Sequence, residues 1–160
     1  MPSRWGGYGS RTRECFRPTL ETGYDGGMAE QGSGFAVSSL DELGDGYGFR
    51  KIRQGVGVTA FGINAIVLPP GYETGVHYHE QQEETYFVHQ GQVEFRFGDG
   101  SKHLLGPGGV ARVDAETHRG MRNAGDGDAV VVVAGGREGY VGRDGVPVGS
   151  GPADGPPGAA

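Results

Sequence analysis

Short runs of alternating apolar and polar residues, separated by turn residues, fill the middle of the chain. The clearest run places Val93, Phe95 and Phe97 on alternate positions, which is the two-residue period of a strand with one buried face. Gly91 and Gly100 lie in the turns on either side of this run. The same pattern predicts short strands at residues 35–40, 49–53, 59–68, 76–79, 85–90, 93–97, 102–105, 110–113, 119–123 and 129–134.

These strands predict an all-β domain. No stretch of the chain shows a convincing helical period, and many short strands at regular spacing are typical of a sandwich or a barrel. The domain is predicted over residues 35–145, with its core at 59–134. Residues 140–146 are expected to pack against the outside of the barrel. The interior packing is assigned to Phe61, Ile63, Ala65, Val67 and Phe95.

Both ends of the chain differ in composition from this domain. Residues 1–34 are rich in Gly, Arg and Ser without an apolar period, and they are predicted to form a disordered arm. Met28 could serve as a start, so residues 1–27 are interpreted either as an upstream extension from a wrongly assigned start codon or as a real flexible arm. Residues 146–160, rich in Pro, Gly and Ala, are predicted to form a disordered tail.

The charge of the chain narrows the classes of partner. Its formal net charge is −6 and no basic stripe is present, so neither nucleic acid nor an anionic membrane is expected as a partner. The first residues lack the apolar segment of a secretory signal, and no apolar run is long enough to span a membrane. Cys15 is the only cysteine, which argues against a disulfide framework and fits a reducing, cytoplasmic location.

The stretch 71–91 carries the strongest chemical signal. His77 and His79 are two positions apart, so in a strand their imidazoles point to one face. Glu84 lies five positions after His79, and because five is odd, the polar run 80–83 must form a turn before Glu84 can face the histidines. Two imidazoles and a carboxylate on adjacent strands are the ligand set of a divalent metal such as Fe, Mn, Ni or Zn.

The spacing of this stretch resembles the first motif of the cupin family. That motif reads Gly, five residues, His, one residue, His, three or four residues, Glu, six residues, Gly. Every position is met here, by Gly71, His77, His79, Glu84 and Gly91. The resemblance covers about half of the chain, and it implies the double-stranded β-helix, or jelly-roll barrel, of cupins. It also implies a homodimer, because cupin barrels commonly pair through their sheets. The alternative is an exposed polar hairpin whose histidines have no role.

The family's second motif is met in spacing but not in residue type. It reads Gly, five residues, Pro, one residue, Gly, two residues, His, three residues, Asn, and its histidine is the fourth metal ligand. Counting from Gly108 to Asn123 puts Arg119 at the histidine position. The Pro and Gly positions are taken by Asp114 and Glu116. His118 is one place earlier and should face outward, because neighbours on a strand face opposite sides, unless a bulge near residue 117 exchanges the two.

Arg119 is expected to point into the barrel, where two roles are open. Its planar guanidinium is suited to grip the carboxylate or phosphate of an anionic ligand. The alternative is a structural ion pair with Glu84 in a barrel that binds no metal. Tyr86 shares the face of Glu84 and is predicted to line the cavity, where it either donates a hydrogen bond to a ligand or packs in the core. His89 and His103 are expected to face solvent.

The predicted site is compatible with three functions. The first is a metal-dependent enzyme of the oxygenase or isomerase type, in which a metal on the three ligands polarises a small anionic metabolite and Arg119 holds its acidic group. For an isomerisation, Glu83 or Tyr86 would carry the proton. The other two are a non-catalytic module that binds a small molecule and a structural cupin without metal. The reaction class and the catalytic residues stay open.

Overall fold

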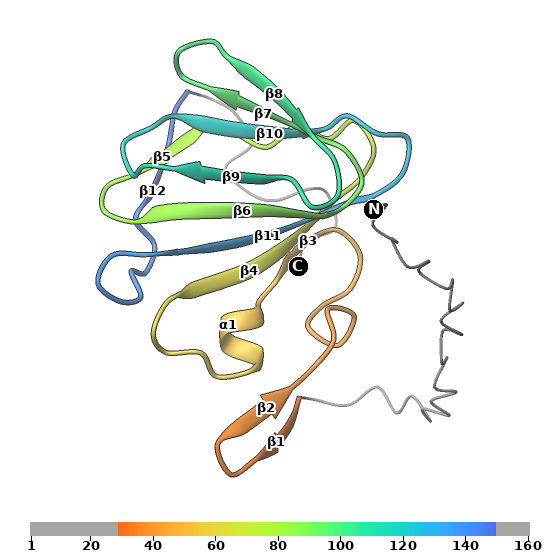
Figure 1. Cartoon of the computed structure of the whole chain (residues 1–160), viewed down its shortest axis with the longest axis vertical. Helices are drawn as coiled ribbons and strands as arrows, with labels where there is room; N and C mark the ends of the chain where they lie inside the picture. The colour runs from red at the N-terminus through yellow and green to blue at the C-terminus, as the bar shows by residue number, and fades with distance from the viewer. Residues whose placement is uncertain (1–28, 150–160) are drawn as a thin grey trace, which may run out of the picture.

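A computed structural model of the chain describes residues 29–149, and its elements are labelled in Figure 1. This part of the chain is almost entirely β-structure. Its elements, in chain order, are β1 (Glu30–Gly32), β2 (Phe35–Val37), β3 (Gly48–Arg50), α1 (Ile52–Gly55), β4 (Gly62–Leu68), β5 (His77–His79), β6 (Glu83–Gln90), β7 (Val93–Phe97), β8 (Lys102–Leu105), β9 (Val110–Val113), β10 (Arg119–Asn123), β11 (Ala129–Gly136) and β12 (Gly145–Pro147). Within residues 29–149, no helix has the length and apolar character that a membrane crossing would need.

Two five-stranded antiparallel sheets form the barrel, one above the other in Figure 1. The first has the strand order β12-β5-β10-β7-β8, and the second has the order β3-β4-β11-β6-β9. Consecutive strands repeatedly cross from one sheet to the other, which is the jelly-roll arrangement that the sequence predicted. The separate β1–β2 hairpin lies at one end of the molecule (Figure 1).

The core lies between the two sheets, because the strands alternate buried and exposed residues. In β6, Glu84, Tyr86 and Val88 are buried, while their neighbours on the strand are exposed. Phe95 on β7 is fully buried and stacks edge-on against Tyr86, with ring centroids 5.4 Å apart. The buried cluster draws on both sheets and contains Ile66, Leu68, Tyr86, Val88, Val93, Phe95, Val113, Met121, Ala129, Val131 and Val133.

Strand β4 presents the opposite face from the one predicted. Ile66 and Leu68 belong to the buried cluster between the sheets, so Ala65 and Val67 lie on the other face of the strand. Ala65 is nevertheless fully buried, as predicted for a packed residue. Phe61 precedes the strand and is 43% exposed. The assignment failed because β4 is apolar on both faces, so its composition does not indicate which face is inside.

Two residues of the cupin motifs are explained by their place in the turns. Gly91, between β6 and β7, has a φ of 79°, and a Cβ there would lie 2.8 Å from Cα of Ala129, so this position requires glycine. Asn123, at the end of β10, is fully buried. Its side-chain amide donates to the carbonyls of Leu68, at 2.9 Å, and Gly127, at 2.8 Å, and this ties the end of β10 to β4.

Two short strands fall inside the segments that the sequence predicted to be disordered. β1 lies in the arm 1–34, and most of β12 lies in the tail 146–160. Neither strand has an apolar run of its own: β1 is held by pairing with β2, and β12 is held by pairing with β5. The other predictions for residues 1–28 and 150–160 concern residues outside those that the structure describes.

Candidate metal centre

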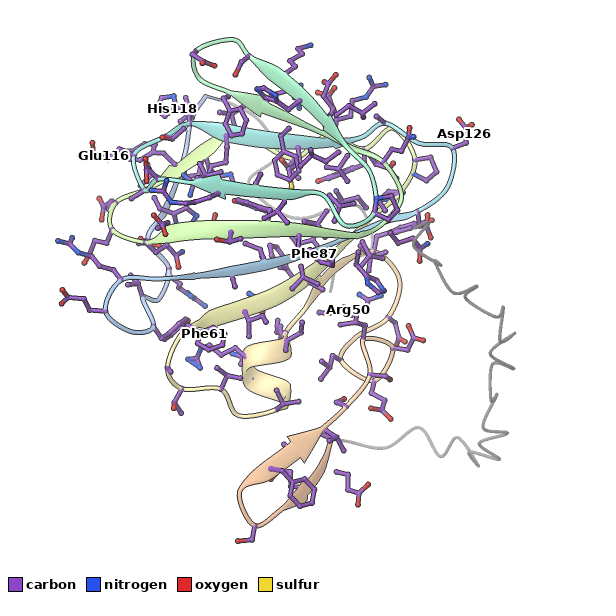
Figure 2. The ribbon with its side chains drawn as sticks, in the orientation of Figure 1. Arg50, Phe61, Phe87, Glu116, His118 and Asp126 are labelled. Atoms are coloured by element: carbon purple, nitrogen blue, oxygen red, sulfur yellow. The ribbon has the colours of Figure 1, made fainter. Side chains whose placement is uncertain are left out.

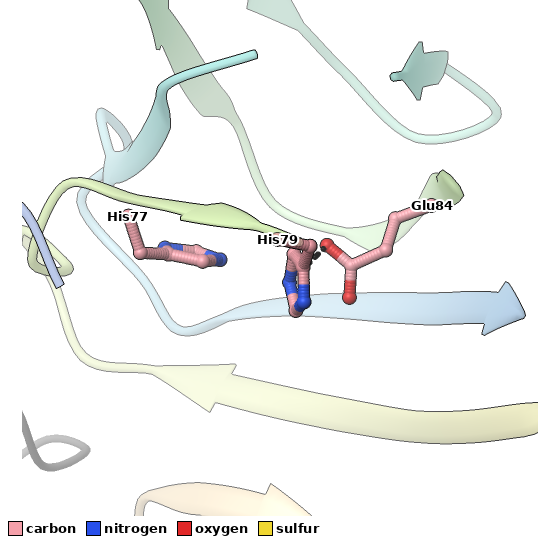
Figure 3. Close-up of side chains that lie close together, drawn as sticks. All are labelled: His77, His79 and Glu84. Carbon is pink, nitrogen blue, oxygen red and sulfur yellow. Dashed lines mark ion pairs between the residues drawn. The ribbon is translucent and has the colours of Figure 1, made fainter. Parts of the chain in front are cut away.

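The three predicted metal ligands come together inside the barrel (Figure 3). His77 and His79 project from β5, with their ring centroids 5.3 Å apart and their planes at 80°. Glu84 projects from β6, which belongs to the opposite sheet, so the turn between β5 and β6 carries the chain from one sheet to the other. One possible ligand atom from each residue lies within 4.8 Å of the other two. The predicted turn therefore resolves the odd spacing between His79 and Glu84.

His79 is the most constrained of the three. It is 7% exposed, and its Nδ1 lies 2.7 Å from a carboxylate oxygen of Asp144. Its Nε2 is buried and makes no hydrogen bond of good geometry in the described structure, although Oε2 of Glu84 is 3.2 Å away. A carboxylate on one imidazole nitrogen, with the other nitrogen aimed at further ligands, is the usual arrangement of a metal-binding histidine.

Asp144 is a site residue that the sequence analysis missed. Residues 140–146 were expected to pack outside the barrel, but Asp144 is only 6% exposed. Its second carboxylate oxygen accepts hydrogen bonds from the backbone N–H groups of Gln81, at 3.1 Å, and Gln82, at 2.9 Å. The expectation failed because β12 adds to the edge of the sheet beside β5, which brings the preceding residue against His79. No spacing rule joins two residues that are 65 positions apart.

One carboxylate oxygen of Glu84, Oε2, makes several polar contacts. It accepts hydrogen bonds from the hydroxyl of Tyr86 and, at 3.1 Å, from Nη2 of Arg119, and it lies 3.2 Å from His79. The other oxygen, Oε1, makes none of these contacts. Glu83, its neighbour on the strand, faces the other way and pairs with exposed Arg112 at 2.7 Å. Glu83 is therefore not placed to carry a proton at this site.

Arg119 is inside the barrel, as the spacing predicted. It lies opposite His77 in the pairing of β10 with β5, and it is 1% exposed. Besides Glu84, its guanidinium donates to the carbonyls of Ala115, at 2.9 Å, and Thr117, at 2.8 Å, and to the hydroxyl of Tyr86, at 3.4 Å. Most of its donors are therefore engaged by the protein, and its predicted role in ligand binding stays a prediction.

The remaining histidines lie away from the metal ligands. His118 is exposed on the outside of the barrel and stacks on Tyr78, with ring centroids 5.3 Å apart (Figure 2). His89 and His103 are also exposed, as expected. The described structure has no bulge that brings His118 inward, so the side chain at the family's fourth ligand position is Arg119.

Burial and neighbouring groups shift the pKa values of His77, His79 and Glu84. Burial and the nearby Arg119 charge lower the pKa of His77. Burial alone would lower the pKa of His79, but the contact and charge of Glu84 and the hydrogen bond with Asp144 outweigh it and raise the pKa. Burial would raise the pKa of Glu84, but its bonds with His79 and Tyr86 outweigh it and lower the pKa. The neighbouring carboxylates therefore favour a proton on His79, and a cation at Nε2 would compete with a proton there.

A cavity of about 490 Å³ opens beside these residues. His77, His79, Glu84 and Tyr86 line it on one side, and apolar side chains of both sheets line much of the rest. Arg143 on the segment before β12 contributes the only Lys or Arg side chain in this lining among the described residues. Burial and the charge of Glu84 raise the pKa of Tyr86 far above its ordinary value, so its hydroxyl keeps its proton.

The donor set fits a divalent cation. Two imidazoles and one carboxylate are good ligands for Fe, Mn, Ni or Zn. The Nε2 atom of His79 is buried and has no hydrogen-bond partner of good geometry, so its lone pair is available to a cation when Nε2 carries no proton. Arg119 is the feature that opposes a cation. Its guanidinium is 3.1 Å from the Glu84 carboxylate, so its positive charge repels a cation bound there. This site should therefore bind metal more weakly than a site with a neutral fourth ligand.

Comparison with known proteins agrees with the fold and the motif. The family model described as a cupin domain matches residues 65–135. A search of curated protein sequences found no significant match. Among solved structures, a sugar phosphate isomerase of the cupin superfamily from Silicibacter pomeroyi is 28% identical with a TM-score of 0.52, over 56% of this chain and 58% of that one.

Two further solved structures are similar. A candidate sugar phosphate isomerase from Acidithiobacillus ferrooxidans is 25% identical with a TM-score of 0.51, over 56% of this chain and 58% of that one. A cupin protein from Bacteroides fragilis is 24% identical with a TM-score of 0.56, over 71% of this chain and 97% of that one. The chain thus matches little more than half the length of the two isomerase structures. The family match and the jelly-roll fold show that residues 65–135 form a cupin domain.

Proposed function

We propose that this cupin binds a divalent metal on His77, His79 and Glu84 and uses it to hold a small anionic metabolite. The observation that carries the proposal is the convergence of the three ligand atoms within 4.8 Å at the wall of the cavity. A metal bound there would act as a Lewis acid toward an oxygen of the ligand. The cavity volume of about 490 Å³ is within the range of small-molecule sites.

Within this proposal, the isomerase class has the most support. The similarity to the Silicibacter pomeroyi sugar phosphate isomerase favours a phosphorylated sugar or a related anion as the ligand. Tyr86 lines the cavity with a hydroxyl that keeps its proton, so it can serve as a proton donor to the ligand but not as the base.

We propose that Arg119 recognises the anionic group of the ligand, provided that its hydrogen bond to Glu84 is released. Its Nη2 now donates to Glu84, so a ligand anion would have to take the place of that carboxylate. If Glu84 served as a metal ligand, this donor would become free, and Arg119 could then pair with the anionic group of the ligand. Pairing into a homodimer also stays a prediction. Exposed Phe87 and Val110, neighbours on the outer face of the second sheet, are suited to it.

A second candidate is a binding cupin that works without metal. The ion pair between Arg119 and Glu84 favours it, because this pair already supplies Glu84 with a buried positive partner. In that case the cavity would bind its ligand through Tyr86, the histidines and the apolar walls. The two candidates differ in one respect that can be measured: the first requires a metal for ligand binding and the second does not.

Isotope exchange tests the isomerase class. We expect the metal-loaded protein to incorporate deuterium from heavy water into an aldose or ketose phosphate, at the carbon beside the carbonyl, because isomerisation moves that proton. Proton NMR on a panel of sugar phosphates would follow the loss of signal, with the unphosphorylated sugars as controls. Tyr86→Phe should slow the exchange by about 10²–10⁴-fold, the usual contribution of a proton carrier. Ligand binding to the metal-loaded protein without exchange on any substrate would reject the isomerase class.

A further inference from the structure

The segment after β11 closes over His79 and contributes the carboxylate of Asp144 to the site. Gly145 pairs with His79 in the β12–β5 ladder, and a Cβ on Gly145 would lie 3.4 Å from Cε1 of the imidazole. Arg143, immediately before, has a φ of 48°, in the left-handed region that residues with a side chain rarely adopt. The backbone thus has an unusual conformation immediately before Asp144, whose side chain is buried against His79.

From these contacts we infer that Asp144 is a positioning residue, which holds His79 in the tautomer that binds metal through Nε2. This inference rests on the proposed metal site but concerns a residue outside the family match at 65–135. A carboxylate can only accept a hydrogen bond, so at 2.7 Å it requires the proton of a neutral His79 to be on Nδ1. The lone pair is then on Nε2, which faces Glu84 and His77.

The amide of Gln82 competes for the same ring nitrogen. Its Nε2 lies 2.8 Å from Nδ1 of His79, and an amide nitrogen there would favour the opposite tautomer, with the proton on the metal-facing side. Asp144 prevails over the amide because a hydrogen bond to a charged acceptor is stronger than one from a neutral amide. It prevails over Glu84 because its oxygen is 2.7 Å from Nδ1, whereas Oε2 of Glu84 is 3.2 Å from Nε2 without good hydrogen-bond geometry. Two backbone N–H groups hold the other oxygen of Asp144, so the carboxylate cannot rotate away from the histidine without losing them.

Replacing Asp144 with asparagine separates this role from a structural one. The asparagine oxygen can still accept from the backbone of residues 81 and 82, while its NH₂ would face Nδ1 of His79 and force the proton onto Nε2. We expect Asp144→Asn to fold and to bind Zn²⁺ about 10–100-fold more weakly than the parent, which is the usual effect of removing such a partner. Asp126→Asn is the matched control, because Asp126 is exposed at the opposite end of the barrel (Figure 2).

The tautomer itself can be read without metal. In the metal-free protein, at a pH where His79 is neutral, ¹⁵N NMR should place the proton on Nδ1 in the parent and in Asp126→Asn, and on Nε2 in Asp144→Asn. The same proton position in the parent and Asp144→Asn, or equal Zn²⁺ affinity in the two folded proteins, would overturn the inference. A parent that shows the Nδ1 proton but binds no Zn²⁺ would support the positioning by Asp144 while rejecting the proposed metal function.

Discussion

Replacing Arg119 with methionine is expected to lower the free energy of unfolding of the metal-free protein by about 3–5 kcal/mol. Arg119 is 1% exposed, and its guanidinium reaches Glu84, Tyr86 and two backbone carbonyls. Methionine has a similar length but no charge, so the carboxylate of Glu84 would lose a buried positive partner, and the carbonyls of Ala115 and Thr117 would lose the guanidinium as a donor. Urea denaturation at neutral pH, followed by circular dichroism, measures the change.

Arg112→Met is the matched control for this loss. Arg112 makes the same kind of ion pair, with Glu83 at 2.7 Å, but its side chain is 59% exposed. Exposed pairs contribute little, so this variant should lose less than about 1 kcal/mol. Equal, small losses in the two variants would mean that the Arg119 pair does not stabilise the barrel.

Replacing His79 with alanine is expected to weaken the binding of Zn²⁺ or Mn²⁺ by more than about 100-fold. Loss of a partner that only supports a ligand costs about 10–100-fold, and His79 is proposed as a ligand itself. Its ring is also the point where the two sheets and the segment before β12 meet, through Glu84 and Asp144. Titration of the metal-stripped protein with each ion, by calorimetry, gives the affinity.

The control for this variant is His89→Ala, which removes the same side chain from an exposed position on β6. It should bind metal as the parent does. A melting curve for each variant shows whether the barrel is intact, so that a loss of affinity is assigned to the missing ligand. Equal weakening in both variants would indicate that metal binds to surface histidines and not to the proposed centre.

Much of the fold follows from local patterns in the sequence. The bounds of β7, β8, β9 and β10 agree with those predicted, because each strand is short and is bounded by glycine or turn residues. The face of β4 could not be predicted, since both of its faces are apolar and neighbouring strands decide which one is inside. Helix α1 has four residues, too few to show a period.

Some features of the candidate site could likewise be predicted from the sequence, and others could not. The convergence of His77, His79 and Glu84 follows from strand alternation and the turn between β5 and β6, so the sequence predicted it. The inward position of Arg119 was predicted from its spacing to Gly108 and Asn123. Asp144 was missed because its contact depends on the pairing of β12 with β5, which are far apart in the chain. Nor did the sequence indicate that the guanidinium of Arg119 would be engaged by backbone carbonyls.

The stoichiometry of metal binding tests the central claim most directly. The protein would be stripped with a chelator, dialysed, and titrated calorimetrically with Zn²⁺, Mn²⁺, Ni²⁺ and, without oxygen, Fe²⁺. We expect one site per chain for at least one of these ions, and loss of that site in His79→Ala. A parent protein that takes up none of the four ions, or takes them up as well after His79 has been replaced, would contradict that claim.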